Sequence, residues 1–115
     1  MHRGSNILIG GVVAAMLAAT SAQAQPADCT ATAASIRKAE SELPRLEAAP
    51  PGDKQIVCIT LETVIVFARR FEAHVAQCPR SPHAARTATW RRIASDYTAR
   101  FRDRRCEPSI RGYRG

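Results

Sequence analysis

The sequence predicts an all-α fold: a small three-helix up-down-up bundle stapled by two disulfides. Apolar residues recur at three- and four-residue steps in three segments, and proline-containing breaks separate these segments. No stretch alternates apolar and polar residues in the way that a half-buried strand does. The chain also carries four cysteines among its 115 residues, and an even number of cysteines in a small exported domain favours disulfides.

An export signal is predicted over residues 1–24. A polar start that contains Arg3 precedes an uncharged apolar run over residues 7–20, and Ala22-Gln23-Ala24 matches the pattern that a signal peptidase cleaves. A membrane anchor is the alternative, but the apolar run is shorter than the roughly 20 residues that a spanning helix needs. We therefore expect cleavage after Ala24 and no transmembrane anchor in the mature protein.

The compartment and the domain organisation follow from the signal and the composition. Arginine outnumbers lysine 15 to 2 and alanine is abundant, which is typical of a high-GC bacterial genome. We expect a bacterial periplasmic protein, with secretion as the alternative. The mature chain is expected to form one disulfide-stapled helical domain over residues 25–106, followed by a flexible basic tail over residues 107–115.

The first helix is predicted over about residues 30–48, with Asp28 or Thr30 as its N-cap. Pro44 lies inside its apolar pattern and predicts a kink, because proline removes one helical hydrogen bond while the period continues beyond it. Two separate short helices are the alternative. The residues of the apolar face are Ile36, Ala39, Leu43 and Leu46.

The second helix is predicted over about residues 54–77, after a Pro-Pro-Gly break and with Asp53 as its cap. Its middle turns are apolar nearly all round, and Ile59, Ile65 and Val66 fall outside the main stripe. Such a helix is central, flanked on two sides, or keeps one face for a partner. The main stripe consists of Val57, Leu61, Val64, Ala68, Phe71 and Val75.

The third helix is predicted to begin at Ser81 and Pro82 and to run to about residue 105. Serine caps the first turn, and proline fits the first helical position because its missing N–H has no partner there. One face carries aromatic and aliphatic side chains that we assign to the core: Trp90, Ile93, Ala94, Tyr97 and Phe101.

Helix geometry selects one of the three possible cysteine pairings. Cys58 and Cys78 lie on one helix and would be roughly 30 Å apart at 1.5 Å per residue, whereas a disulfide needs Cα atoms within about 7 Å. In an up-down-up bundle, Cys29 and Cys78 lie at one end, and Cys58 and Cys106 lie at the other. The predicted disulfides are therefore Cys29–Cys78 and Cys58–Cys106.

Positive charge is concentrated in the second half of the chain. Residues 25–68 hold four basic and six acidic side chains, whereas residues 69–115 hold twelve basic and four acidic ones. One interpretation is a solvated surface whose arginines complement the end of the third helix. The other is a site for an acidic protein or an anionic envelope surface; nucleic acid is disfavoured because no basic-aromatic platform is visible. The candidate anion contacts are Arg100, Arg102, Arg104, Arg105, Arg111 and Arg114.

Ile59 and Val66 form the candidate interaction face. They lie seven residues apart on the second helix, opposite its main stripe, and either the other helices cover them or they bind a partner, including a second copy of the chain.

Candidate chemistry is sparse. His74, Cys78 and His83 have a spacing that a metal site uses, but an oxidising compartment favours a disulfide at Cys78. Glu62 lies beside the apolar middle of the second helix, and we expect it to pair with Arg69. No nucleophile motif or phosphate-binding loop is present, so we expect no catalytic residue, no metal and no cofactor.

The expected function is therefore binding rather than catalysis, through a protein partner, an envelope surface or a role in stress. The alternatives are a structural domain with no dedicated ligand and, less favoured, a small metal-binding protein or enzyme. The sequence does not identify the partner.

Overall fold

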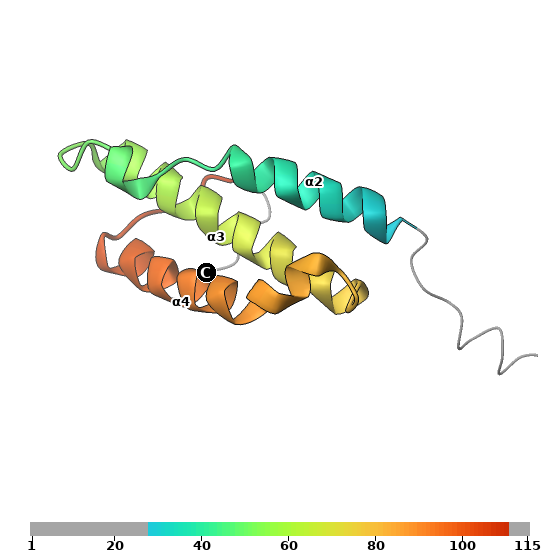
Figure 1. Cartoon of the computed structure of the whole chain (residues 1–115). Coiled ribbons are helices and arrows are strands. Elements are labelled where there is room, and N and C mark those ends of the chain that lie inside the picture. Colours follow the sequence, from blue (N-terminus) through green and yellow to red (C-terminus); the bar gives the residue numbers. More distant parts are fainter. Residues whose placement is uncertain (1–27, 111–115) are drawn as a thin grey trace, which may run out of the picture.

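Three α-helices and two short 3-10 helices make up the part of the chain that the computed structural model describes, residues 28–110. The long helix α3 (Lys54–Gln77) lies between α2 (Cys29–Ser41) and α4 (Thr87–Asp103) (Figure 1). The 3-10 helices are η1 (Leu46–Ala48), before α3, and η2 (Pro82–Arg86), directly before α4. The predicted all-α three-helix bundle is confirmed. The predicted export signal lies outside the described residues.

The first helical segment is bent by 27°, but it is not one helix that continues to residue 48. α2 ends at Ser41, and Pro44 lies in a non-helical link that leads to η1. Pro44 has no N–H to donate to the carbonyl oxygen of Glu40, and its ring disfavours helical backbone at Leu43. The alternative of two shorter helical segments is therefore the one found.

α3 has the bounds that the sequence predicts. The Asp53 side chain accepts a hydrogen bond from the Ile56 N–H at 3.1 Å and so caps the first turn. The predicted cap at Ser81 is also confirmed, because its Oγ accepts from the His83 N–H at 3.2 Å. Ser81 caps η2, which passes directly into α4, so the third helix begins with a tighter turn than expected.

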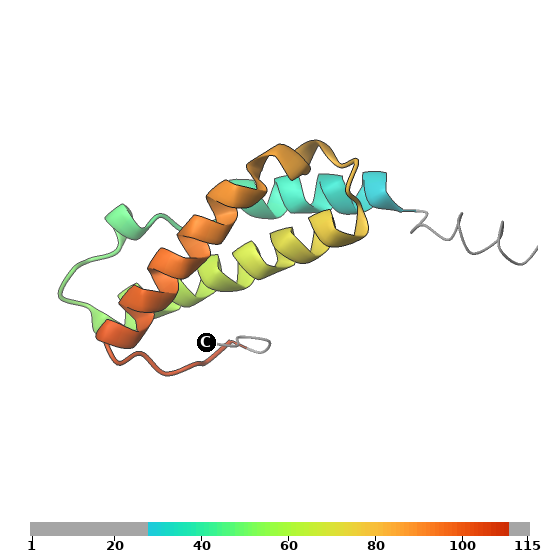
Figure 2. The same cartoon turned by 90° about the horizontal axis from the view of Figure 1, so that it is seen from below.

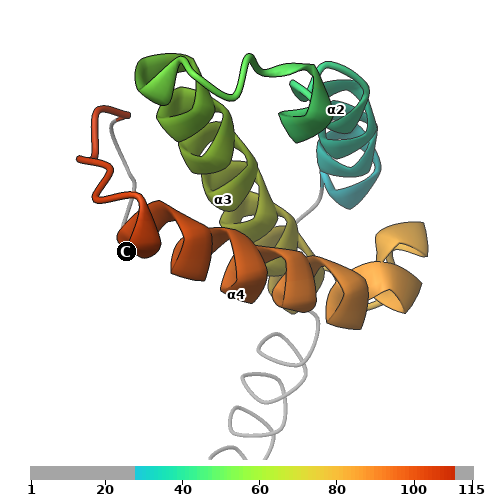
Figure 3. The same cartoon turned by 90° about the vertical axis from the view of Figure 1, so that its left-hand side faces the viewer.

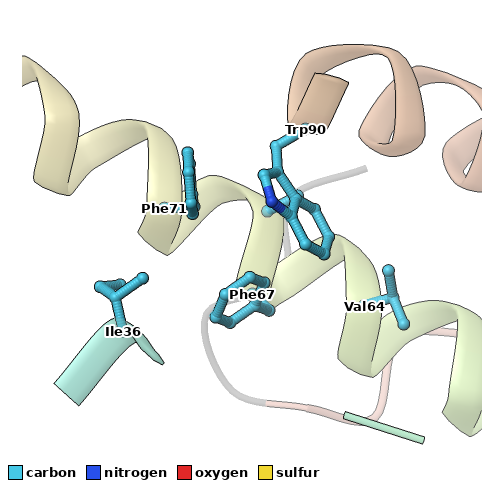
Figure 4. Close-up of a cluster of buried hydrophobic side chains, with 6 residues drawn as sticks. Ile36, Val64, Phe67, Phe71 and Trp90 are labelled. Atoms are coloured by element: carbon cyan, nitrogen blue, oxygen red, sulfur yellow. The ribbon is translucent and has the colours of Figure 1, made fainter. Parts of the chain in front are cut away.

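The core lies along α3, which packs most extensively against α4 and then against α2. One cluster joins all three helices through Ile36, Phe71 and Trp90 (Figure 4). The Phe67 and Trp90 rings meet edge to face, with centroids 4.8 Å apart, an arrangement that aromatic pairs favour. A second cluster lies toward the start of α3 and consists of Val57, Leu61, Ile65 and Phe101.

Both predicted disulfides are confirmed. Cys29–Cys78 joins the start of α2 to the residue that ends α3, with Cα atoms 5.9 Å apart. Cys58–Cys106 joins the first turns of α3 to the residues after α4, with Cα atoms 5.5 Å apart. We call these the Cys29–Cys78 end and the Cys58–Cys106 end of the bundle. Two disulfides indicate an oxidising compartment.

Polar contacts hold α2 against the rest of the bundle. Arg86 of η2 donates two hydrogen bonds to the Glu40 carboxylate, both at 2.7 Å. The Arg86 hydrogen bond holds the pKa of Glu40 below its usual value, although partial burial opposes this effect. The buried ring of His83 donates from Nε2 to the carbonyl oxygen of Ala33 at 2.9 Å. η2 therefore holds α2 in place through the side chains of His83 and Arg86.

Three neighbours surround α3 when the bundle is viewed along this helix. α2 lies on one side, α4 on a second, and the segment after α4 on a third (Figure 3). This segment leaves the end of α4 and runs back alongside α3 (Figure 2). Its placement creates the candidate site.

Candidate functional site

A hollow of about 530 Å³ lies at the Cys58–Cys106 end, between the first half of α3 and the segment that follows α4. Each lining residue comes from one of these two elements, and the disulfide joins them at the rim. α3 supplies Lys54, Gln55, Cys58, Ile59 and Glu62, and the segment after α4 supplies Arg105, Cys106, Glu107, Pro108 and Ser109. The hollow thus combines apolar side chains with two cationic side chains and two carboxylates, those of Glu62 and Glu107.

Glu62 is the most unusual member of this set, because its side chain is charged and yet only 1% exposed. Its Oε2 accepts hydrogen bonds from the Ser109 N–H at 2.8 Å and the Ile110 N–H at 3.0 Å. Its Oε1 accepts one from the Ser109 hydroxyl at 2.8 Å. These three donors satisfy a buried carboxylate, whose desolvation would otherwise be costly.

Two sequence expectations bear on this contact. The expected pairing of Glu62 with Arg69 stays a prediction, and the donors found on the carboxylate belong to Ser109 and Ile110. A flexible tail was expected over residues 107–115; residues 107–110 contain these donors, and residues 111–115 lie outside the described residues. We call residues 107–110 the strap.

Exposed large apolar side chains lie only at the Cys58–Cys106 end among residues 28–110. They are Ile56 and Ile59, each 43% exposed. The sequence analysis had not singled out Ile56, although its spacing of three residues from Ile59 places both on one side of the helix. Ile65, which we had placed outside the main stripe, is fully buried in the second core cluster.

Val66 lies apart from Ile59. It is half-buried and lines a smaller hollow of about 290 Å³ between α2 and α3, beside Leu43 and Phe67. The structure therefore places the two residues of the predicted interaction face in different surroundings, and only Ile59 belongs to the larger hollow.

The predicted arginine cluster is also divided. Arg105 lines the main hollow, whereas Arg100 and Arg104 line a separate hollow of about 240 Å³ beside the link that precedes α3. Arg100 pairs with Asp96 at 3.3 Å. Arg102 is exposed and lines neither hollow. The remaining two candidates, Arg111 and Arg114, lie outside the described residues.

Arg105 stands out for its backbone. Its φ of 56° is in the left-handed region, and it is the one non-glycine residue with positive φ among residues 28–110. The Cys106 N–H bonds the Phe101 carbonyl at 3.0 Å, and the Arg105 N–H bonds the Arg102 carbonyl at 2.9 Å. This pattern ends many helices, and glycine usually occupies the left-handed position because any Cβ is disfavoured there. Here an arginine occupies it at the rim of the hollow.

The histidine pair lies at the Cys29–Cys78 end, with ring centroids 5.6 Å apart. Cys78 is bonded to Cys29, so the third member of the candidate metal set has no thiolate to offer. His83 bonds the Ala33 carbonyl, and His74 Nε2 lies 2.8 Å from Ser81 Oγ. Within residues 28–110, no group of three or more His, Cys, Asp or Glu side chains is placed to hold a metal ion.

His74 and Ser81 together resemble the base and the hydroxyl nucleophile of a catalytic triad. Burial lowers the pKa of His74, and the neighbouring His83 lowers it further, which favours the neutral ring. In a catalytic triad a third group orients the base, but His74 Nδ1 has no hydrogen-bond partner within the described part of the chain. Ser81 also caps η2, which gives the contact a structural role.

Comparisons with known proteins identify no relative. No protein-family model matches the chain, and neither a curated protein nor a solved structure matches it. Among the described residues, no helix is both long enough and apolar enough to cross a membrane.

Proposed function

We propose that this protein acts by binding a protein partner in the periplasm, through the hollow at the Cys58–Cys106 end. The observation that carries the proposal is the position of Arg105 and Ile59 in one hollow, where an arginine with strained backbone lies near an exposed apolar side chain. Exposed apolar groups beside charged ones commonly mark contact surfaces. The matching partner is an acidic protein that also presents an apolar side chain.

The backbone of Arg105 supports a role for its side chain. A non-glycine residue in the left-handed region costs roughly 1 kcal/mol, and glycine would remove that cost. A position that stability alone would give to glycine instead carries a cation at the rim of a hollow. Strained backbone of this kind concentrates at functional sites.

An anionic envelope surface fits the same arginines less well. A flat membrane contact favours cationic side chains on one face, whereas Arg105 lines the main hollow and Arg100 and Arg104 line another. A concave surface with a few cationic groups suits a protruding segment of a protein better.

The test is site-specific photocrosslinking of the exported chain in cells that produce it. Ile59 is replaced by p-benzoylphenylalanine, and the exposed Thr89 in the first turn of α4 serves as the matched position. We expect a discrete adduct at position 59 and none at position 89. Because Arg105 is expected to contact acidic groups of the partner, the yield of adduct in isolated envelopes should fall as salt rises.

Two arginine variants distinguish a specific contact by Arg105 from nonspecific attraction by the positive charge of the protein. Arg105→Gly should raise the free energy of unfolding by about 1 kcal/mol and still reduce the adduct. Arg92→Ala removes the same charge from an exposed position on α4 and should leave the adduct unchanged. Equal effects of the two variants would indicate nonspecific electrostatic attraction and overturn the site.

Other outcomes identify the rival functions. An adduct of twice the monomer mass would indicate a homodimer in place of an acidic partner. Binding to phosphatidylglycerol vesicles without any protein adduct would indicate the envelope surface. Neither adduct nor vesicle binding would indicate a structural domain without a dedicated ligand.

A further inference from the structure

The strap forms one wall of the hollow that the proposed function assigns to a partner, and it covers Glu62 on the adjoining face of α3. We propose that the strap is a tethered stand-in for that partner, and that the ligand of this face is an extended peptide segment carrying a serine or threonine. The segment would donate two backbone N–H groups and one hydroxyl to Glu62, as Ser109 and Ile110 do in the free protein. This inference rests on the proposed function and names the class of its partner.

The chemistry of Glu62 defines what can replace the strap. The Glu62 carboxylate is 1% exposed with the strap in place and loses these three donors when the strap leaves, so a ligand that covers it again must supply donors of its own. An apolar surface or a lipid tail has no donors to offer. An extended backbone offers an N–H at each non-proline residue, and a neighbouring hydroxyl supplies the third donor.

The strap is held weakly enough to exchange. Within the described residues its hydrogen bonds are the three to Glu62, and Pro108 has no N–H to donate. Residues 107–109 are exposed and Ile110 is only half-buried. Segments with few buried contacts open locally at small free-energy cost.

The strap also stays close when it opens. Cys106 is bonded to Cys58, so the residue before the strap remains fixed to α3. A tether this short holds the strap at a millimolar effective concentration near Glu62. A peptide that binds in its place must overcome this internal competitor, so release of the strap should increase the affinity for the peptide.

The test uses the exported chain with both disulfides formed and one substitution, Ser109→Pro. Proline removes the Ser109 N–H and the hydroxyl together, which leaves Ile110 as the one remaining donor. The probe is a fluorescein-labelled peptide with the sequence of residues 107–112, Glu-Pro-Ser-Ile-Arg-Gly. Fluorescence anisotropy measures its dissociation constant.

We expect Ser109→Pro to bind this peptide about tenfold more tightly than the unsubstituted chain does, because the tethered competitor is weakened. Glu107→Ala is the matched control: it alters the strap and keeps all three donors, so its affinity should equal that of the unsubstituted chain. A peptide with proline in place of serine should not bind. Adding Glu62→Gln to Ser109→Pro should also abolish binding.

A folded Ser109→Pro variant that binds neither peptide, or binds both equally, would overturn the inference. If Ser109→Pro does not fold, Ser109→Ala removes only the hydroxyl, and hydrogen exchange at the Ile110 amide reports release of the strap. Faster exchange with increased peptide affinity would support the inference, and faster exchange with unchanged affinity would overturn it.

The two proposals fail separately. Adducts at position 59 without peptide binding would keep the proposed function and remove the peptide as its partner. Peptide binding without adducts would support a peptide site on α3 and remove the acidic partner protein.

Discussion

The two ends of the bundle have the same covalent closure and different surroundings. Each has one disulfide, and the two disulfides span 49 and 48 residues. At the Cys29–Cys78 end, buried His83 and the Arg86–Glu40 pair hold α2 in place. The Cys58–Cys106 end has exposed isoleucines, a strained helix end and a strap held by a single carboxylate.

This difference teaches that similar disulfides do not give similar surroundings, although a hollow borders each of them, of about 530 Å³ at Cys58–Cys106 and about 370 Å³ at Cys29–Cys78. A disulfide limits how far the chain can separate, mainly by restricting the unfolded state. Side-chain packing and satisfied polar groups decide whether the surface beside it is closed or available. The predictions below test this contrast, from the largest effect to the smallest.

Removing either disulfide should give the largest effect. Cys29→Ser with Cys78→Ser, and Cys58→Ser with Cys106→Ser, each open a loop of close to 50 residues and should each cost about 4 kcal/mol. Urea denaturation measures this cost. Only the second pair should also speed hydrogen exchange at the Ser109 amide, because Cys106 anchors the strap. Equal exchange in both variants would contradict the assigned difference between the ends.

The next largest effect on the free energy of unfolding is expected from two isoleucines on α3, which serve as matched controls for each other. Ile65→Ala should lower the free energy of unfolding by about 2–5 kcal/mol, because Ile65 is fully buried. Ile59→Ala should cost less than about 1 kcal/mol, because Ile59 is 43% exposed. Comparable losses would mean that Ile59 belongs to the core and that this end is closed.

The Arg86–Glu40 pair should contribute less to the free energy of unfolding than Ile65 does. Arg86→Gln removes a two-pronged contact between partly exposed side chains and should cost about 0.5–1 kcal/mol. Because Arg86 holds the pKa of Glu40 below its usual value, the contribution is present above the usual value of 4.5 and is lost as pH falls below it. Thermal unfolding of both forms between pH 3 and pH 7 measures the difference, which should vanish at the acid limit.

The smallest effect on the free energy of unfolding is expected from protonation of His74 in mild acid. Burial holds the pKa of His74 below its usual 6.5, so the unfolded chain binds a proton more readily than the folded one. Stability from this group is complete above pH 6.5 and declines as pH falls toward the lowered pKa. In His74→Gln this part of the decline between pH 7 and pH 5 should disappear. An unchanged slope of stability against pH would show that His74 does not titrate on unfolding.

Helix positions and cysteine pairing followed from sequence because local rules set them. The α3 bounds come from Asp53 and the apolar period, and helix length excludes a bond between Cys58 and Cys78. The end of α2 was misjudged, because the apolar pattern continues past Pro44 although the helix does not.

The contacts that define the two ends could not be read from sequence. The strap binds Glu62 mainly through backbone N–H groups, and His83 binds a backbone carbonyl. Nearly every residue has these backbone groups, so they leave no pattern in a sequence. The partners also lie about 50 residues apart along the chain. The left-handed backbone of Arg105 was equally hidden, because glycine is its usual marker.

The placement of the disulfides makes α3 a covalent hub. α2 is bonded to its C-terminal end through Cys29–Cys78, and the segment after α4 is bonded to its first turns through Cys58–Cys106. A protease that cuts after Arg45 and after Arg80 breaks both inter-helix connections, yet the three pieces remain one molecule until a reductant is added. The chain can therefore survive cleavage in its loops as one covalently joined molecule, a useful property in an oxidising compartment that contains proteases.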